Sequence, residues 1–329
     1  MSALLKVRDL HVTFRRGKRV HKAVDGVSFE VAAGETVGLV GESGCGKTVT
    51  SLAVLGLLPE RGTEVSGSVS FDGRELLGLP ERELEGVRGR QVAMIFQDPM
   101  TSLNPVLTVG EQVAESLRRH EGLSQKDALA RTVEMFKLVQ IPNAAARVHD
   151  YPHQFSGGMR QRVMIAMALA CKPKLVIADE PTTALDVTIQ AQILDLLQDM
   201  KDRFGMAVML ITHAMGVVAE TAQRVVVMYA GKVVEEADVE SLFESPSHPY
   251  TQGLIRSIPR IDLDSAHKTR LEAIGGTVPI LINPAPGCRF APRCRYAFAR
   301  CAVEEPVLRE VAPRHRMACH LGDPQGAAS

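Results

Sequence analysis

Eight consecutive residues, GESGCGKT at 41–48, combine three glycines, a lysine and a threonine in a spacing that suits phosphate binding. They match the pattern G-x-x-x-x-G-K-[ST] and lie between a strand-like and a helical segment, the context this pattern requires. Glycines let backbone N–H groups curl around one anion, and the N-terminus of the following helix adds a partial positive charge. The stretch therefore predicts a nucleotide-binding loop.

Within this loop we expect Lys47 to reach the β- and γ-phosphates of ATP and Thr48 to coordinate Mg²⁺. Cys45 is expected to be a residue of the loop rather than a catalytic thiol. The residues that we assign to ATP binding here are Gly41, Glu42, Ser43, Gly44, Cys45, Gly46, Lys47, Thr48 and Val49.

A second candidate site is LVIADE at 175–180, an apolar strand that ends in two acids. Asp179 would hold the Mg²⁺ shell through water, and Glu180 would polarise the attacking water. The alternative is a carboxylate that caps a helix before Pro181. The phosphate loop upstream favours the metal and water roles.

Four cysteines near the end of the chain form a third candidate site: Cys288, Cys294, Cys301 and Cys319. Their spacing contains neither the C-x-x-C knuckle of many zinc sites nor the short ferredoxin spacing. Free thiols, a zinc site and an iron–sulfur cluster all stay open, with His315 and His320 as competing ligands, while a reducing compartment disfavours disulfides. Phe290, Tyr296 and Phe298 lie between the thiols, either as a shield for a cluster or as the core of a small domain.

These candidate residues must be held in place by the surrounding helices and strands. Strand-like and helix-like patterns alternate over residues 1–255, and this alternation predicts an α/β fold with buried parallel strands. Strands are expected at 4–14, 91–96, 174–180, 207–213 and 224–236, and two strands within 28–41 meet at a turn. Helices are expected at 47–58, within 109–140, and at 157–171 and 188–205. From about 256 the chain is rich in Pro, Arg and Cys, so we place a linker near 256–280 and a small tail domain after it.

The charge composition and the lack of long apolar stretches disfavour several classes of function. Lys+Arg and Asp+Glu both number 38 in 329 residues, which argues against a broad nucleic-acid surface. The charged residues Lys6, Arg8 and Asp9 interrupt the apolar run that a signal peptide needs. No apolar stretch approaches the ~20 residues of a membrane-spanning helix. We therefore expect a cytosolic protein whose membrane contact is made through a partner.

Further motifs follow in a fixed order: Gln97 in IFQDP, FSGGMRQR at 155–162, the acidic strand, TALD at 183–186 and ITH at 211–213. With the phosphate loop, this order resembles the ATP-binding-cassette (ABC) ATPases over roughly residues 4–255. The resemblance implies an ABC-type P-loop ATPase, with a RecA-like core, an antiparallel β subdomain and a helical subdomain at about 100–165.

The resemblance also implies roles for single residues. Phe14 would stack on adenine, and Gln97 would sense Mg²⁺ and the γ-phosphate. The signature residues Ser156, Gly157 and Gly158 would open a helix whose N-terminus faces ATP on the opposite subunit. Asp186 would lie at the dimer seam. His213 would contact the γ-phosphate and hold Glu180 and water in line.

Two positions depart from the family pattern: Met159 stands where many members carry Gln, and Ala214 where Asp is usual. Neither of these departures removes a residue that the motifs require, so an active ATPase is favoured over a subunit that binds ATP without hydrolysing it. An ABC ATPase that acts on DNA or ribosomes is disfavoured, because the chain has one cassette and no basic excess.

Longer stretches, including AMIFQDPMTSLNP (93–105) and SPSHPYTQGLI (245–255), resemble the dipeptide/oligopeptide importer subgroup. That resemblance implies a second, paralogous ATPase chain, two permeases and a substrate-binding protein, with this chain at the cytoplasmic face of the inner membrane. It also implies a [4Fe-4S] cluster on the four tail cysteines, with Zn²⁺ as the alternative. Related members move peptides, nickel or glutathione, and this chain does not specify which.

Overall fold

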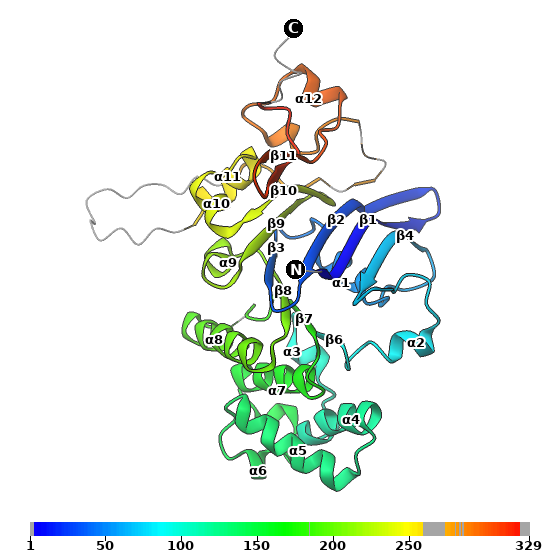
Figure 1. The fold of residues 1–329 in the computed structure, drawn as a ribbon, viewed down its shortest axis with the longest axis vertical. Coiled ribbons are helices and arrows are strands. Elements are labelled where there is room, and N and C mark those ends of the chain that lie inside the picture. The colour runs from blue at the N-terminus through cyan, green and yellow to red at the C-terminus, as the bar shows by residue number, and fades with distance from the viewer. Residues whose placement is uncertain are drawn as a thin grey trace, which may run out of the picture. The chain divides into compact units, whose positions relative to one another are not determined.

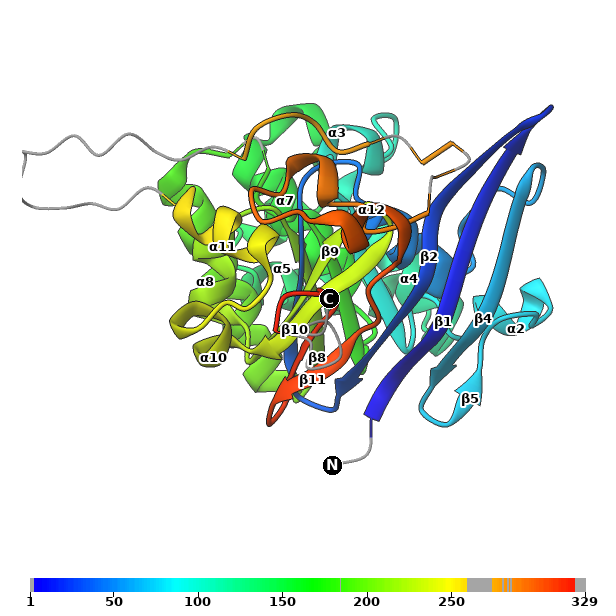
Figure 2. The same cartoon turned by 90° about the horizontal axis from the view of Figure 1, so that it is seen from above.

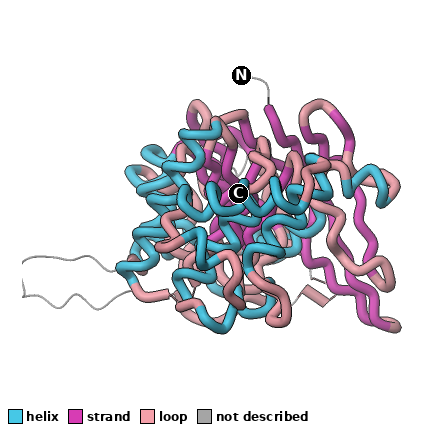
Figure 3. The backbone as a smooth tube through the Cα atoms, turned by 90° about the horizontal axis from the view of Figure 1, so that it is seen from below, coloured by secondary structure: helices cyan, strands magenta, loops and turns pink. Residues whose placement is uncertain are grey.

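The computed structural model describes residues 3–183, 185–258, 274–279, 281–282, 284 and 286–322, and most of the linker expected at 256–280 lies outside them. Figure 1 shows the helices and strands coloured along the chain from the N-terminus to the C-terminus. The chain divides into two compact units. The first comprises residues 1–4, 31–35 and 78–210, and the second comprises 5–30, 36–77 and 211–329. Helices and strands both make up the chain (Figure 3), and a β-strand is followed by a helix within 36–54, 175–204 and 207–221, which confirms the expected α/β class.

The second unit contains an antiparallel sheet in the order β2-β1-β4-β5, whose long strands run lengthwise across Figure 2. Its strands are β1 (Ala3–Arg16), β2 (Arg19–Ala32), β4 (Thr63–Phe71) and β5 (Arg74–Glu75). The buried apolar positions of β1 shift from Leu5 and Val7 to Leu10 and Val12. A bulge between Arg8 and His11 absorbs the extra residue, so both pairs face the same side. Sequence analysis foresaw β1 but missed β4 and β5.

The same unit contains strands in the order β11-β12-β10-β9-β3. They are β3 (Thr36–Val40), β9 (Arg224–Tyr229), β10 (Lys232–Asp238), β11 (Arg309–Ala312) and β12 (His315–Met317). β3 and β9 are parallel, and every residue of β3 is buried, as expected for an inner strand. The segment 224–236 is a hairpin of β9 and β10 rather than one strand. β3 runs directly into the phosphate loop and α1 (Lys47–Val54).

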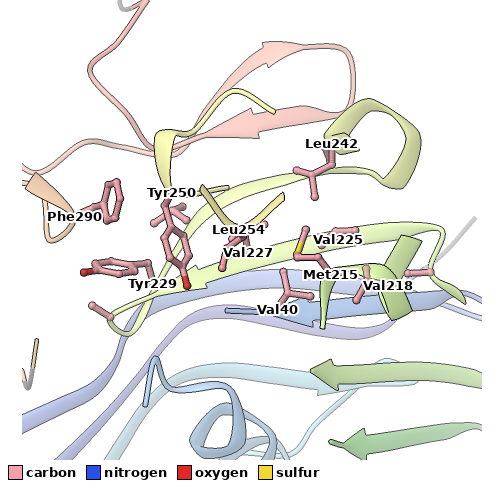
Figure 4. Packing of buried hydrophobic residues seen from close by; sticks show 14 of the residues in the cluster. Val40, Met215, Val218, Val225, Val227, Tyr229, Leu242, Tyr250, Leu254 and Phe290 are labelled. Atoms are coloured by element: carbon pink, nitrogen blue, oxygen red, sulfur yellow. The ribbon is translucent and has the colours of Figure 1, made fainter. Parts of the chain in front are cut away.

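The tail after residue 286 contains only short helices and strands in its described part, but two of its strands join this sheet. It contains a 3-10 turn (Ala291–Arg293), α12 (Ala299–Val303) and the hairpin β11–β12, and Glu235 of β10 pairs with Met317 of β12. Helices α9 (Met215–Thr221), α10 (Val239–Glu244) and α11 (Pro249–Arg256) precede it. Figure 4 shows the core here, where Tyr229, Tyr250 and Phe290 pack together.

The first unit combines the strands that end in the acidic motif with a group of helices. β6 (Val92–Ile95) and β7 (Leu175–Asp179) are parallel, and β8 (Ala207–Thr212) follows β7 in order. Its helices are α2 (Glu81–Glu85), α3 (Pro99–Ser102), α4 (Val109–Glu121), α5 (Gln125–Leu138), α6 (Ala144–Arg147), α7 (Gly157–Leu169) and α8 (Val187–Phe204), with a 3-10 turn at Pro152–Gln154.

Helix α7 packs against α3, α4, α5 and α8, which fixes the direction in which its N-terminus points. Helices α4, α5, α7 and α8 begin at side-chain caps: Thr108, Ser124, Ser156 and Asp186 each accept a backbone N–H. Within the described residues, no helix is both long and apolar enough to cross a bilayer.

Candidate functional site

The phosphate loop owes its shape to glycines that no larger residue could replace. A Cβ on Gly41 would collide with the carbonyl oxygen of Met228, and one on Gly46 would lie 2.5 Å from the carbonyl oxygen of Ala23. Gly46 also has φ of 103° and is the N-cap of α1. The loop is therefore held close to neighbouring backbone, and α1 starts at Lys47 with its N–H groups at the loop.

The lysine of the loop is buried within it. Lys47 is 5% exposed, and its Nζ donates to the carbonyl oxygens of Gly41 at 2.7 Å and Glu42 at 3.0 Å. Ser43, Gly44 and Thr48 are exposed, while Val49 is half-buried. Burial raises the pKa of the Cys45 thiol, so this residue is a protonated filler at neutral pH.

In the first unit, two acidic residues lie at the end of β7, and their burial and backbone conformation differ. Asp179 is 2% exposed at the strand end. Glu180 follows with φ of 46°, a left-handed conformation that is costly for a residue with a Cβ. Its carboxylate accepts from Gln97 Nε2 at 3.1 Å and from Thr183 Oγ1 at 2.9 Å. The structure thus brings Glu180 and Gln97 together, 83 positions apart in sequence.

The signature residues form the N-terminus of α7. Ser156 is the N-cap, with its Oγ 3.4 Å from the N–H of Met159. Gly157 and Gly158 make up the first turn, and a Cβ on Gly158 would lie 2.8 Å from Ile189 Cγ2 of α8. Asp186 caps α8 through the N–H of Ile189 at 3.0 Å. Ala184 of the TALD motif lies outside the described residues.

Two further predicted residues lie in the second unit. His213 is exposed directly after β8, and the next N–H, that of Ala214, donates to Thr212 Oγ1 at 3.0 Å. The Phe14 ring stacks on His21, with ring centroids 6.2 Å apart and planes 22° apart.

The four tail cysteines form no disulfide with one another, and their thiols influence one another electrostatically. Cys288 donates its N–H to the carbonyl oxygen of Cys301 at 2.8 Å. Burial raises the pKa of Cys319 to about 11, and the other three thiols add to this rise. Even so, the described part of the chain contains no group of three or more His, Cys, Asp or Glu residues arranged to hold a metal ion.

The two histidines that could compete with these thiols as metal ligands, His315 and His320, have other contacts. His315 Nε2 lies 2.7 Å from Glu235 Oε1, and His320 Nε2 lies 2.9 Å from the carbonyl oxygen of Glu304. Phe290 is 4% exposed in the core, whereas Tyr296 and Phe298 are exposed by 43% and 42%. The aromatic residues between the cysteines therefore do not form one shield.

Sequence analysis missed the residues that surround Glu42 in the phosphate loop. Tyr250 Oη accepts the N–H of Glu42 at 2.8 Å, and Arg293 forms an ion pair with the Glu42 carboxylate at 2.6 Å. Tyr250 lies within a stretch that carried the family resemblance, but no local pattern indicated its partner. Arg293 precedes Cys294 and offered no signal of its own.

Comparison with known proteins agrees with these motifs. Residues 24–183 match the family described as ABC transporter, and residues 234–301 match the oligopeptide/dipeptide transporter C-terminal region. The probable peptide ABC transporter ATP-binding protein y4tR of Sinorhizobium fredii is 56% identical, over 96% of this chain and 94% of its own. The oligopeptide transport ATP-binding protein AppD of Bacillus subtilis is 50% identical, over 99% of both chains.

The dipeptide transport ATP-binding protein DppD of Escherichia coli is 49% identical, over 97% of this chain and 96% of its own. Among solved structures, the ATP-binding cassette MJ0796, a dimer in a post-hydrolysis state with ADP and phosphate, superposes with a TM-score of 0.64. It is 28% identical and covers 71% of this chain and 98% of its own. The chain therefore belongs to the ABC transporter family, as an ATP-hydrolysing subunit of its peptide-transporter branch.

Proposed function

We propose that this ATPase powers the import of dipeptides or oligopeptides across the inner membrane. The observation that carries the proposal is identity of about one half to peptide-transport ATP-binding proteins along nearly the whole chain, including the C-terminal region particular to that branch. Its partners would be a second, paralogous ATPase, two permeases and a substrate-binding protein. The chain would work at the cytoplasmic face of the membrane.

The division of labour along the chain is part of this proposal. Residues 1–255 would form the ATPase domain, with the helical subdomain at about 100–165 facing a permease. Residues 256–329 would form the C-terminal extension. The helical subdomain and the loop at Gln97 would pass the movement of the ATPase pair to the permeases.

ATP would bind with its phosphates at Gly41–Thr48 and its adenine at Phe14. Lys47 neutralises β- and γ-phosphate charge, and its present acceptors are two backbone carbonyls that a phosphate can replace. Thr48, Gln97 and Asp179 supply oxygen atoms of the kind Mg²⁺ prefers. Bound Mg²⁺ would neutralise charge that develops on the phosphates.

Hydrolysis would depend on Glu180 and His213. The Glu180 carboxylate orients and polarises water, and His213 holds the γ-phosphate and that water in line. Gln97 and Thr183 fix the Glu180 carboxylate before substrate arrives, which lowers the cost of ordering it in the transition state. The signature residues Ser156, Gly157 and Gly158 would face ATP bound to the partner chain, and Asp186 would lie at the seam between the two chains.

The direct test replaces Glu180 with Gln in the complete transporter. The amide keeps the size of the side chain but loses the charge that polarises water. We expect MgATP binding to remain and ATP turnover to fall by at least about 100-fold. Dipeptide uptake into proteoliposomes should stop with it, while nickel and glutathione serve as competing substrates. Full turnover by the Glu180→Gln complex would reject the assignment, and uptake of only nickel or glutathione would reject the peptide substrate.

The four tail thiols are proposed to hold a [4Fe-4S] cluster. What supports this is the family resemblance together with one contact between the cysteines: Cys288 donates its N–H to the carbonyl oxygen of Cys301 at 2.8 Å. Burial is the main cause of the raised pKa of Cys319, and Cys288, Cys294 and Cys301 add to it. Cys288, Cys294, Cys301 and Cys319 would ligate the iron as thiolates, and this ligation would link the tail's short elements to one another.

The cluster is tested on full-length protein purified without oxygen. We expect about four irons and four sulfides per chain and a broad visible absorption, all of them lost in Cys319→Ser. Stoichiometric zinc would support the alternative metal, and a preparation with neither metal would leave free thiols as the correct description.

A further inference from the structure

The segment 288–294, CRFAPRC, does more than carry two of the tail cysteines: its arginines contact the surroundings of the phosphate loop. Arg293 donates from both terminal nitrogens to the Glu42 carboxylate, Nη1 to Oε2 at 2.6 Å and Nη2 to Oε1 at 3.0 Å. The Arg293 side chain is only 5% exposed. Two parallel charge-assisted hydrogen bonds in a sheltered place make a strong and directional pair.

The remaining donors of Arg293 hold its guanidinium in place. Nε donates to the carbonyl oxygen of Gly275 at 2.7 Å, and Nη2 also lies 3.3 Å from the carbonyl oxygen of Ile274. Nη1 lies 3.4 Å from Tyr229 Oη. The Glu42 carboxylate raises the pKa of Arg293, so the guanidinium stays a cation throughout the range in which the protein works. Arg293 is thus a fixed positive charge beside Glu42.

The backbone of Glu42 is held from the same side. Its N–H donates to Tyr250 Oη at 2.8 Å, and Tyr250 is fully buried. Figure 4 shows Tyr250 with Tyr229 and Phe290, and the three ring centroids lie 4.7 to 5.4 Å apart. Phe290 belongs to the same tail segment as Arg293, so its packing and the ion pair stabilise the same contact.

Arg289, four residues earlier in the segment, contacts residues next to the other end of the phosphate loop. Its Nη1 donates to the carbonyl oxygen of Ala230 at 2.5 Å, and its Nη2 pairs with Asp25. The N–H of Gly231, the next residue after Ala230, donates to the carbonyl oxygen of Cys45 at 2.9 Å. The tail segment is therefore connected to the loop directly at Glu42 and, through Ala230 and Gly231, at Cys45.

We infer that Arg293 is a positioning residue for ATP binding: it neutralises Glu42 and fixes that carboxylate away from the phosphates that the loop receives. Glu42 directly follows Gly41, and an unneutralised carboxylate there would repel a polyphosphate bound at Lys47. The tail thereby contributes to nucleotide affinity from 251 positions away in sequence. The inference rests on the proposal that ATP binds at this loop.

The experiment measures the Kd of the full-length chain for MgATP in four forms: wild type, Arg293→Met, Glu42→Gln and the double variant. Methionine keeps much of the apolar stem but loses the charge and all donors. We expect Arg293→Met to weaken binding about tenfold, the scale of one hydrogen bond to a charged group. Measured against Glu42→Gln alone, the double variant should lose much less affinity than Arg293→Met loses against wild type, because the repelling charge is gone.

Kinetics of the complete transporter give a second measurement. Arg293→Met should raise KM for ATP more than it lowers kcat, since Glu180 and His213 are untouched. Arg293→Lys should lie between wild type and Arg293→Met, because lysine supplies charge without the bidentate geometry. Arg300→Met is the matched control: it removes another tail arginine, which pairs with Glu304 at 2.7 Å, and should leave KM unchanged.

Two results would overturn the inference. One is an Arg293→Met chain that binds MgATP as tightly as wild type. The other is a double variant that loses as much affinity against Glu42→Gln as Arg293→Met loses against wild type, which would mean that Arg293 only anchors residues 274–276. Thermal unfolding of each variant distinguishes lost affinity from lost folding, and the double variant carries the test if Arg293→Met alone is unstable. Failure of the wild-type chain to bind MgATP would instead reject the proposed function.

Discussion

His248 shows how the second unit treats a titratable residue that has been withdrawn from water. It is 1% exposed and caps α11, where its Nδ1 accepts the N–H of Tyr250 at 3.0 Å. Burial lowers its pKa to about 3, so the imidazole is neutral in the folded protein. In the unfolded chain a histidine has its ordinary pKa near ~6.5.

This difference predicts a pH-dependent loss of stability. Below pH ~6.5 the unfolded chain binds a proton that folded His248 does not, so the free energy of unfolding falls as pH falls from ~6.5 to ~3. At pH ~5.5 the contribution amounts to about 1.4 kcal/mol. His248→Asn keeps a cap acceptor and does not titrate, so its stability should fall less between pH 7.5 and 5.5.

Urea unfolding at the two pH values measures the effect. The exposed His149, changed to Asn, is the control and should keep the wild-type dependence on pH. If His248→Asn loses as much stability as wild type over this interval, His248 is not the neutral buried group described here.

At the scale of elements, the two signature glycines have different packing roles although they are neighbours. A Cβ on Gly158 would lie 2.8 Å from Ile189 Cγ2, whereas one on Gly157 would meet its nearest atom, Leu185 Cδ2, at an ordinary 3.6 Å. Only Gly158 is therefore required for the close approach of α7 to α8. Gly157 must have another reason to lack a side chain, and the proposed approach of the partner's nucleotide supplies one.

We accordingly predict opposite effects from the two alanine substitutions. Gly158→Ala should push α7 from α8 and lower the free energy of unfolding by about 1–3 kcal/mol. Gly157→Ala should leave stability unchanged or raise it slightly, because alanine favours helix. Its ATPase activity in the complete transporter should nevertheless fall. Chemical denaturation and ATPase assays on both variants check this, and equal destabilisation by the two would contradict the packing argument.

At the scale of the whole molecule, the proposed ATP sites are each completed by a second chain, so a signature mutation should act on the partner's site. The solved relative MJ0796 is a dimer of cassettes with ADP and phosphate. In this chain Ser156 caps α7, a helix of 13 residues. The N-terminus of such a helix is suited to binding an anion.

Mixed complexes test this assignment. With Lys47→Ala in this chain, the remaining turnover comes from the partner's phosphate loop, and adding Ser156→Ala should lower it roughly tenfold or more. With the partner's phosphate loop disabled instead, Ser156→Ala should change turnover little. The reverse pattern would place Ser156 at this chain's own site.

Motifs built from neighbouring residues were readable from the sequence alone. The loop at 41–48, the acids that end β7 and the cap at Ser156 each use a short stretch whose chemistry and local geometry are set together by residue type and spacing. The elements around them were mostly foreseen too, since burial on both faces of β3, β7 and β9 leaves a continuous apolar signal.

Contacts between distant residues were decided only by tertiary structure. The short strands β11 and β12 have no periodicity long enough to recognise, and they form because β10 offers an edge to pair with. Gln97 meets Glu180, and Arg293 meets Glu42, because packing brings their backbones together. A charged residue in a sequence does not identify its partner, since many opposite charges are available and only the fold selects one. The sequence therefore determined which nucleotide chemistry this protein performs, and the tertiary structure decided which residues hold that chemistry in place.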